Sequence, residues 1–297
     1  MEYFIKNLWP IIKKDIINIL AYIGVLVTIK DVFEFFNVTI SRMLFIVVLI
    51  IGMIVIISIN LPKKEYIFNI KDRDIKIKLK IGNLLKEKAA IVVPTNSTFD
   101  TKMENDFISI HSVQGQVQDK YFKNNITTLD YLIEKELEGK QFTELKDRKE
   151  TKSKRYEIGT TAEINQNGMR FYFLADSDIN SKGKAINPSI MNITDSLSRF
   201  WQYIGEYGHV EPIAIPIIGT GRMGIVDSRE EILKNIVFSF VANNTTKKIA
   251  TELIICIRKN DIKKYNIDIN EIVEYIKYTC KYQYEKINDN NNGIGIE

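Results

Sequence analysis

The residues best suited to chemistry form a glycine-rich loop between an apolar run and a helix. The run Pro212–Ile218 leads into Gly219-Thr220-Gly221-Arg222-Met223-Gly224-Ile225. Glycines let backbone N–H groups approach an anion closely, and the positive end of a following helix favours negative charge. We therefore predict that this loop cradles a phosphate or diphosphate. An ordinary tight turn between strand and helix is the alternative.

Two familiar phosphate-binding motifs fit this loop poorly. The spacing Gly219-x-Gly221-x-x-Gly224 matches the dinucleotide fingerprint only formally, because the next helix is expected to begin at Asp227 or Ser228, after the glycines. The strand after that helix ends in Ile257-Arg258-Lys259-Asn260, with no acidic residue at its tip for a ribose. A Walker A loop is excluded because no Gly-Lys-Ser/Thr follows.

Two more polar loops carry groups for binding the rest of such a ligand. The run Val92-Val93-Pro94 leads into Thr95-Asn96-Ser97-Thr98-Phe99. In this loop Asn96 offers a donor and an acceptor for a ribose hydroxyl, and Phe99 offers a ring for stacking. The third candidate loop is Ser112-Val113-Gln114-Gly115-Gln116. For the Asn96 loop a plain turn remains the alternative, since Pro-Thr-Asn-Ser is also a turn sequence.

An α/β domain is expected to position these loops. Apolar or alternating runs predict strands, and helical patterns separate several of them. Expected strands are 75–81, 89–93, 170–175, 212–218 and 252–257, and expected helices are 194–205 and 228–242. Ser228 and Glu231 have the spacing of a capping box. Alternating strands and helices predict a layered domain with a mixed, largely parallel sheet over 63–285. A charged insertion at about 119–156 is predicted to be a helix followed by an exposed excursion, and 286–297 a disordered tail.

Composition and charge exclude several classes of function. The net charge of +4 comes without a long basic run, so no nucleic-acid partner is expected. The two cysteines and two histidines form no close pair of metal ligands: Cys256, Cys280, His111 and His209. Neither a disulfide framework nor a metal site is therefore predicted.

The first sixty residues hold two apolar stretches. Met43–Ile59 carries no charge and, at roughly 17 residues, lies at the lower limit for crossing about 30 Å of hydrocarbon. Ile16–Ile29 is extended towards Phe36 by further apolar residues. The alternatives are a signal peptide, buried core helices and membrane-surface helices. We predict a two-helix transmembrane hairpin in 1–62, with helices at about 12–36 and 43–60.

Positive charges set the expected orientation of this hairpin. Lys6, Lys13 and Lys14 precede the first stretch, and Lys63 and Lys64 follow the second. The short connection has less positive bias, so both termini are predicted to be cytoplasmic. The expected location is the inner (plasma) membrane, as a multi-pass protein in contact with the lipid bilayer.

Three segments of the predicted α/β domain resemble segments of macro domains. Ile91–Asn96 resembles their apolar strand and Asn loop, and Pro216–Ile225 resembles their diphosphate loop. Ile81-Gly82-Asn83-Leu84 is similar to the element whose acidic residue holds the adenine amino group, although here Asn83 would make an amide contact. The resemblance covers about 75–257. It implies a three-layer sandwich that binds an ADP-ribose derivative and has no cofactor. The ligand-binding residues expected from the three loops and this resemblance together are Asn83, Leu84, Thr95, Asn96, Ser97, Phe99, Ser112, Gln114, Gly115, Gln116 and the loop Gly219–Ile225.

A macro-like domain behind two predicted membrane helices resembles the effectors of type II Thoeris anti-phage systems. That resemblance implies a TIR-domain protein that converts NAD into an ADP-ribose-derived signal conjugated to histidine. It also implies that the effector binds this signal, forms a homo-oligomer and disrupts the membrane, which causes abortive infection. We expect a sensor and not an enzyme. The alternatives are a membrane-bound ADP-ribose hydrolase, with Asp100, Glu104 or Asp106 as its base, and a constitutive pore or scaffold.

Overall fold

The chain divides into two compact units, Met1–Lys63 and Lys64–Glu297. The computed structural model describes residues 2–37, 41–59, 63–103, 108–123, 125–146, 148, 151–180, 183, 185–186, 188–219, 228–244 and 247–283. Each unit is a separate body and has its own packing.

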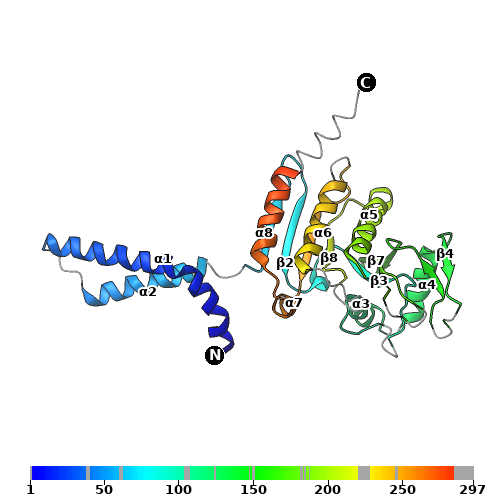
Figure 1. Ribbon diagram of the computed structural model, residues 1–297, viewed down its shortest axis with the longest axis horizontal. Helices are drawn as coiled ribbons and strands as arrows, with labels where there is room; N and C mark the ends of the chain where they lie inside the picture. Colours follow the sequence, from blue (N-terminus) through cyan, green and yellow to red (C-terminus); the bar gives the residue numbers. More distant parts are fainter. Residues whose placement is uncertain are drawn as a thin grey trace, which may run out of the picture. The chain divides into compact units, whose positions relative to one another are not determined.

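The first unit is a pair of antiparallel helices, α1 (Glu2–Phe35) and α2 (Arg42–Ile59) (Figure 1). The hydroxyl of Tyr22 donates to the Val48 carbonyl at 2.8 Å. Gly52 admits the Tyr22 ring, because a Cβ at this position would lie 2.0 Å from its Cζ. The α1 helix begins at Glu2, well before the expected start near residue 12. Lysines such as Lys13 and Lys14 favour helix as much as apolar residues do, so the apolar stretch does not mark where the helix begins.

Many large apolar side chains of this hairpin face outward. Leu20, Val25, Leu44 and Ile51 are each more than half exposed. Within the described residues, no helix combines the length and apolarity needed to span a bilayer.

The second unit is built on a seven-stranded mixed sheet in the order β1-β2-β9-β8-β3-β7-β6. Its five central strands are parallel, and the edge strands β1 and β6 are antiparallel to their neighbours. The strands are β1 (Glu65–Asn69), β2 (Lys76–Ile81), β3 (Ala90–Asn96), β6 (Thr161–Gln166), β7 (Met169–Ser177), β8 (Ile213–Pro216) and β9 (Glu252–Ile257). The prediction of a mixed, largely parallel sheet is confirmed.

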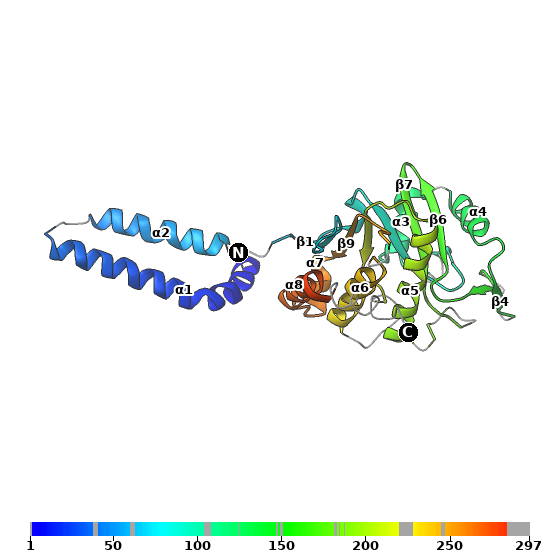
Figure 2. The same ribbon diagram turned by 90° about the horizontal axis from the view of Figure 1, so that it is seen from above.

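Helices cover both faces of the sheet and give three layers (Figure 2). One face packs on α5 (Ile190–Tyr207), α6 (Arg229–Asn243) and α8 (Ile269–Tyr278), through a core that includes Trp201, Ile236 and Ile276. The other face packs on α3 (Val113–Tyr121) and α4 (Ile126–Glu136), through a smaller cluster that includes Val117 and Leu129. Two short helices, η1 (Leu84–Lys86) and α7 (Lys259–Lys264), follow β2 and β9.

The charged insertion differs from its prediction. After α4 the chain forms a small hairpin of β4 (Phe142–Glu144) and β5 (Lys154–Tyr156). This hairpin folds back onto the loop after β3, where the Tyr156 N–H donates to the Ser97 carbonyl at 2.8 Å. It is not simply an exposed excursion, because Tyr156 and Arg148 are buried. The predicted tail 286–297 lies outside the described residues.

Candidate functional site

The carboxyl ends of the parallel strands meet at one edge of the sheet and enclose a cavity there. Strands β3 and β8 pair only through Ala90–Ile213 and Ile91–Ala214. Beyond these pairs each strand contains a proline, Pro94 or Pro216, which has no N–H for a ladder. The next strand of the sheet reached after β3 lies on the β7 side of this pair, and the next one reached after β8 is β9, on the other side. Such a topological switch point is where open α/β sheets form a ligand crevice.

The cavity at this edge, called the main cavity below, has a volume of about 390 Å³. A larger pocket of about 620 Å³ lies beside α4 and is lined by residues such as Asp100 and Asp130. Three strand ends, the start of α3 and the segment around α7 supply the walls of the main cavity. The residues used below are Thr95, Asn96, Ser112, Gln114, Asp176, Gly219, Arg258, Lys264 and Tyr265.

A second hollow of about 320 Å³ adjoins the main cavity. Both are lined by Val113, Pro216, Ile217 and Arg258, so the two spaces share a wall. Polar groups of the second hollow come from Asn83, Gln116, Asn260 and Asp261. Together the hollows form an elongated site with a different set of side chains at each end.

Only the first residue of the predicted phosphate loop falls within the described chain. Gly219 lines the main cavity with φ +72°, a backbone conformation that favours glycine. Its N–H donates to the carboxyl group of Asp176. Residues Thr220, Gly221, Arg222, Met223, Gly224 and Ile225 lie outside the described residues, so the phosphate cradle stays a prediction.

Asp176 is a buried carboxyl group on the wall of the cavity. It lies one residue before the end of β7 and is only 5% exposed. Burial raises its pKa to about 7, while hydrogen bonds from Gly219 and Ser177 oppose the shift. Near neutral pH this group can therefore accept a hydrogen bond or, when protonated, donate one.

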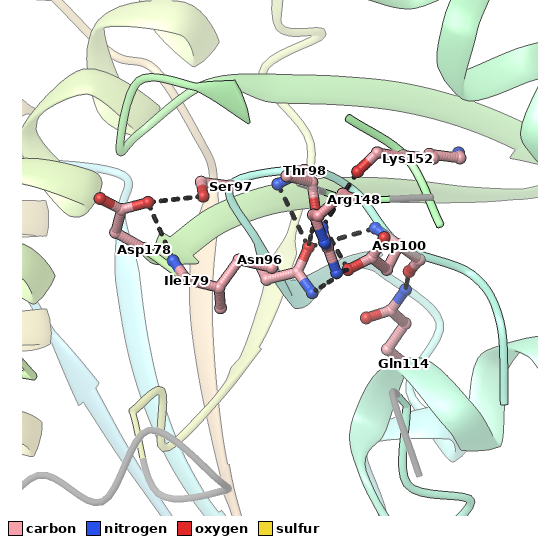
Figure 3. Close-up of polar contacts among 9 residues, drawn as sticks. All are labelled: Asn96, Ser97, Thr98, Asp100, Gln114, Arg148, Lys152, Asp178 and Ile179. Carbon is pink, nitrogen blue, oxygen red and sulfur yellow. Dashed lines mark hydrogen bonds and ion pairs between the residues drawn. The ribbon is translucent and has the colours of Figure 1, made fainter. Parts of the chain in front are cut away.

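The amide of Asn96 is largely committed to its own loop (Figure 3). Its Oδ1 accepts from the N–H groups of Thr98 and Asp100 at 3.2 and 3.1 Å, and its Nδ2 donates to Asp100 Oδ2 at 2.9 Å. The expected open amide is thus corrected: one N–H of Nδ2 remains for a ligand, and the acceptor is already used. Next to it, the buried Thr95 hydroxyl has no hydrogen-bond partner in the described part of the chain.

The structure corrects the predictions for Phe99 and Gly115, which do not line either hollow. Phe99 is fully buried and packs edge-on against Tyr156, with 5.7 Å between ring centroids. Gly115 serves close packing, because a Cβ there would lie 2.2 Å from the Ser109 carbonyl oxygen. Ser97 is also buried, and its hydroxyl donates to Asp178 at 2.9 Å.

The remaining predicted residues line the hollows while holding local structure. Ser112 caps α3 through Gly115 N–H at 2.9 Å, and Gln114 Nε2 donates to the Asp100 carbonyl at 2.6 Å. In the second hollow, Asn83 caps η1 through its Oδ1, with Leu84 buried beside it. Gln116 Nε2 donates to the His111 carbonyl at 3.0 Å.

Sequence reasoning missed the groups on β7 and around α7. Asp176 and Ser177 end β7, while Arg258 and Lys264 place two cations around the cavity. Arg258 Nη1 also donates to the His111 carbonyl at 3.2 Å. The rule that ligands bind at the carboxyl ends of parallel strands, applied to every predicted strand, would have found Asp176 and Arg258.

Metal and thiol chemistry find no support in the described residues. Within them, no group of three or more His, Cys, Asp and Glu side chains is placed to hold a metal ion. Cys256 and Cys280 are buried and unpaired with each other, and burial raises the pKa of both thiols to about 12. Both thiols are therefore protonated near neutral pH.

Comparisons with known proteins give matches to a family and to solved structures. No curated protein matches the chain. The Oceanobacillus iheyensis macrodomain with MES bound has a TM-score of 0.48 and 12% identity, over 72% of this chain and 96% of that one. The same macrodomain with ADP has a TM-score of 0.48 and 11% identity, over 71% and 97%. A tomato leucine aminopeptidase variant has a TM-score of 0.40 and 11% identity, over 75% and 38%.

The family match extends over most of the sheet. The family described as "Thoeris protein ThsA, Macro domain" matches residues 77–258, which is more than half of the chain. The match begins in β2 and ends directly after β9, so it includes the glycine loop and most of the lining of both hollows, while the residues of α7 and Tyr265 lie beyond it. The chain therefore belongs to the Thoeris ThsA macro-domain family.

Proposed function

We propose that the protein is a membrane-anchored sensor whose α/β unit binds an ADP-ribose-derived nucleotide. The observation that carries this proposal is the elongated pair of hollows at the switch point of a ThsA-family macro domain. Their volumes fall within or near the usual range for small-molecule sites, about 300–1,000 Å³. One of the macrodomains similar in structure is described as holding ADP.

The lining chemistry fits such a ligand in a particular direction. Asn83, Gln116 and Asp261 in the second hollow offer donors and acceptors for a base. Gly219 and Arg258 in the main cavity suit a diphosphate, which accepts hydrogen bonds and carries negative charge. Asn96, Thr95 and Asp176 then face the distal ribose and whatever group it carries.

A binding role is favoured over hydrolysis by the state of the candidate base. Asp100 is almost completely buried, forms an ion pair with Arg148 at 2.7 Å and lines neither hollow of the proposed site. Glu104 and Asp106 lie outside the described residues. We therefore propose a receptor that holds the signal without consuming it, with a TIR-domain protein as its supplier.

The hairpin gives the proposed sensor its output. Exposed apolar side chains along α1 and α2 suit a lipid environment, with both chain termini in the cytoplasm. Ligand binding can drive assembly only if it favours the assembled arrangement. On that basis we propose that the bound nucleotide promotes oligomerisation, and that the assembled hairpins disrupt the inner membrane and stop phage spread.

The proposal is tested by nucleotide calorimetry on the full-length protein in detergent. Gly221→Glu adds bulk and negative charge to the predicted cradle and should lower ADP-ribose affinity at least tenfold, because each lost charge-assisted hydrogen bond is worth roughly 1.5–3 kcal/mol. Gly205→Glu is the matched control, since a Cβ there meets its nearest neighbour at an ordinary 3.6 Å. Wild-type affinity in a folded Gly221→Glu protein would show that the loop is only a turn. Steady release of free ADP-ribose from a conjugate would identify a hydrolase instead.

A further inference from the structure

We propose that Arg148, from the β4–β5 hairpin of the insertion, is a positioning residue for the Asn96 loop and thereby sets the preference for ligands that carry a distal ribose. This inference rests on the proposed function, in which the Asn96 end of the site receives that ribose. Arg148 itself does not line either hollow. It acts through Asp100.

The contact is a buried and well-connected ion pair (Figure 3). The side chains of Arg148 and Asp100 are each 1% exposed, and Nη2 lies 2.7 Å from Oδ2. Arg148 Nη1 also donates to the Thr98 hydroxyl at 2.7 Å and to the Lys152 carbonyl at 3.0 Å. One guanidinium group therefore links two side chains of the Asn96 loop to the β4–β5 hairpin, which is called the strap below.

Asp100 passes this constraint on to the lining of the cavity. The oxygen that meets Arg148 also accepts from Asn96 Nδ2 at 2.9 Å. The Asp100 carbonyl accepts from Gln114 Nε2 at 2.6 Å. Asn96 and Gln114 both line the main cavity, so Asp100 holds two amides of its lining, Asn96 through its side chain and Gln114 through its backbone carbonyl.

Removing the cation would leave a buried carboxylate without its counter-charge. Such a group is costly in a low-dielectric setting, so the Asp100 side chain reorients towards water. This change removes the acceptor that holds Asn96 Nδ2, and the amide of Asn96 loses its fixed direction. At the base end of the site, Asn83 Oδ1 accepts from the Leu85 N–H, and among the described residues no hydrogen bond joins its side chain to this network.

The insertion is held in place by contacts that do not involve Arg148. Tyr156 N–H donates to the Ser97 carbonyl at 2.8 Å, and the Tyr156 ring packs on Phe99. Lys152 forms an ion pair with Asp130 at 2.7 Å. A change at Arg148 can therefore loosen the Asn96 loop while the strap stays attached.

The test compares ADP-ribose with ADP on the full-length protein in detergent. Arg148→Ala should weaken ADP-ribose binding about fivefold, as expected when a misdirected amide loses neutral hydrogen bonds to the ligand, and change ADP binding by less than about twofold. Arg148→Lys keeps the charge but not the planar fork and should recover part of the selectivity. Arg199→Ala, which removes an exposed ion pair with Glu157, is the matched control and should leave both affinities unchanged.

A second measurement works without ligand. Hydrogen exchange of the segment 96–101 should be faster in Arg148→Ala than in wild type and unchanged in Arg199→Ala, because Thr98 and Asp100 N–H groups bond to Asn96 Oδ1. Should Arg148→Ala fail to fold by circular dichroism, Arg148→Lys carries both measurements. Unchanged selectivity together with unchanged exchange in a folded variant overturns the inference. A wild-type protein that binds neither nucleotide overturns the proposed function, and exchange still shows whether Arg148 holds the loop.

Discussion

The hairpin and the α/β unit place the same kinds of side chains in opposite surroundings. In α2, Leu44 and Ile51 are each more than half exposed, whereas Ile236 and Phe240 of α6 are fully buried. A run of exposed apolar side chains is unfavourable in water and marks a surface that something else covers. The comparison teaches that the chain's 45% hydrophobic content serves two purposes. One part builds a core, and the other forms a surface that, in our proposal, meets lipid.

The topology of the hairpin gives the largest expected effect, because labelling is all or none. Ser41→Cys should react with a membrane-impermeant maleimide on intact cells, whereas Glu65→Cys should react only after lysis. The native thiols give little background, since Cys256 and Cys280 are buried and burial raises their pKa to about 12. Reversed labelling would refute the orientation. Release of the protein by a high-salt wash would show that the hairpin does not span the membrane.

A matched pair of phenylalanines measures the difference in energy. Phe200 is fully buried between Tyr172 and Trp201, so Phe200→Ala should lower the unfolding free energy by about 3–5 kcal/mol. Phe35 is 80% exposed, so Phe35→Ala should change the unfolding free energy by less than about 0.5 kcal/mol. Urea unfolding followed by tryptophan fluorescence gives both values. Equal losses would mean that the two units do not differ in the way proposed.

Asp176 sharpens the comparison by placing a titratable group inside the α/β unit. Its folded pKa of about 7 lies above the ordinary value of 3.8, so the folded state holds a proton that the unfolded state has released. The contribution of Asp176 to the unfolding free energy should therefore be most favourable below about pH 4 and be lost as the pH rises from about 4 to about 7. Asp176→Asn removes this dependence on pH. Relative to wild type, its unfolding free energy should rise by about 2–3 kcal/mol more at pH 8 than at pH 5, at roughly 1.4 kcal/mol per pH unit below the folded pKa.

Denaturant unfolding of both proteins at the two pH values measures this gain. The asparagine can still accept the Gly219 N–H, so loss of that hydrogen bond does not complicate the comparison. The same gain at both pH values would show that Asp176 does not titrate in this range.

The smallest effect concerns the start of α6, directly after the glycine loop. Ser228 Oγ accepts from the Glu231 N–H at 3.1 Å, so Ser228→Ala should cost about 1 kcal/mol of unfolding free energy. Ser228→Asp preserves a capping oxygen and should cost much less. Thermal unfolding distinguishes the two variants. If Ser228→Ala lowered the unfolding free energy as much as Phe200→Ala, the start of α6 would contribute more to stability than one capping hydrogen bond does.

Much of the site could be located from local sequence patterns. The apolar runs around Val93 and Ile215 predicted buried strands, and the polar residues after them marked the edge of the sheet that encloses the cavity. The spacing of Ser228 and Glu231 correctly predicted the helix cap, because a cap depends on residues three positions apart. The edge strands β1 and β6 were not predicted, since short and partly exposed strands have weak patterns.

The sequence by itself determined the α/β class, the two apolar stretches and the order of the loops, because these depend on periodicity and on near neighbours. Only the tertiary structure decided what the side chains in those loops do. Phe99 was expected to stack on a ligand but packs against Tyr156, which lies far along the chain. Asn96 was expected to be open, but its direction depends on Asp100 and on Arg148 from the insertion. Contacts between residues about fifty positions apart leave no periodic trace in the sequence, so burial, ion pairing and the presentation of the site appear only once the strap has folded back over the loop.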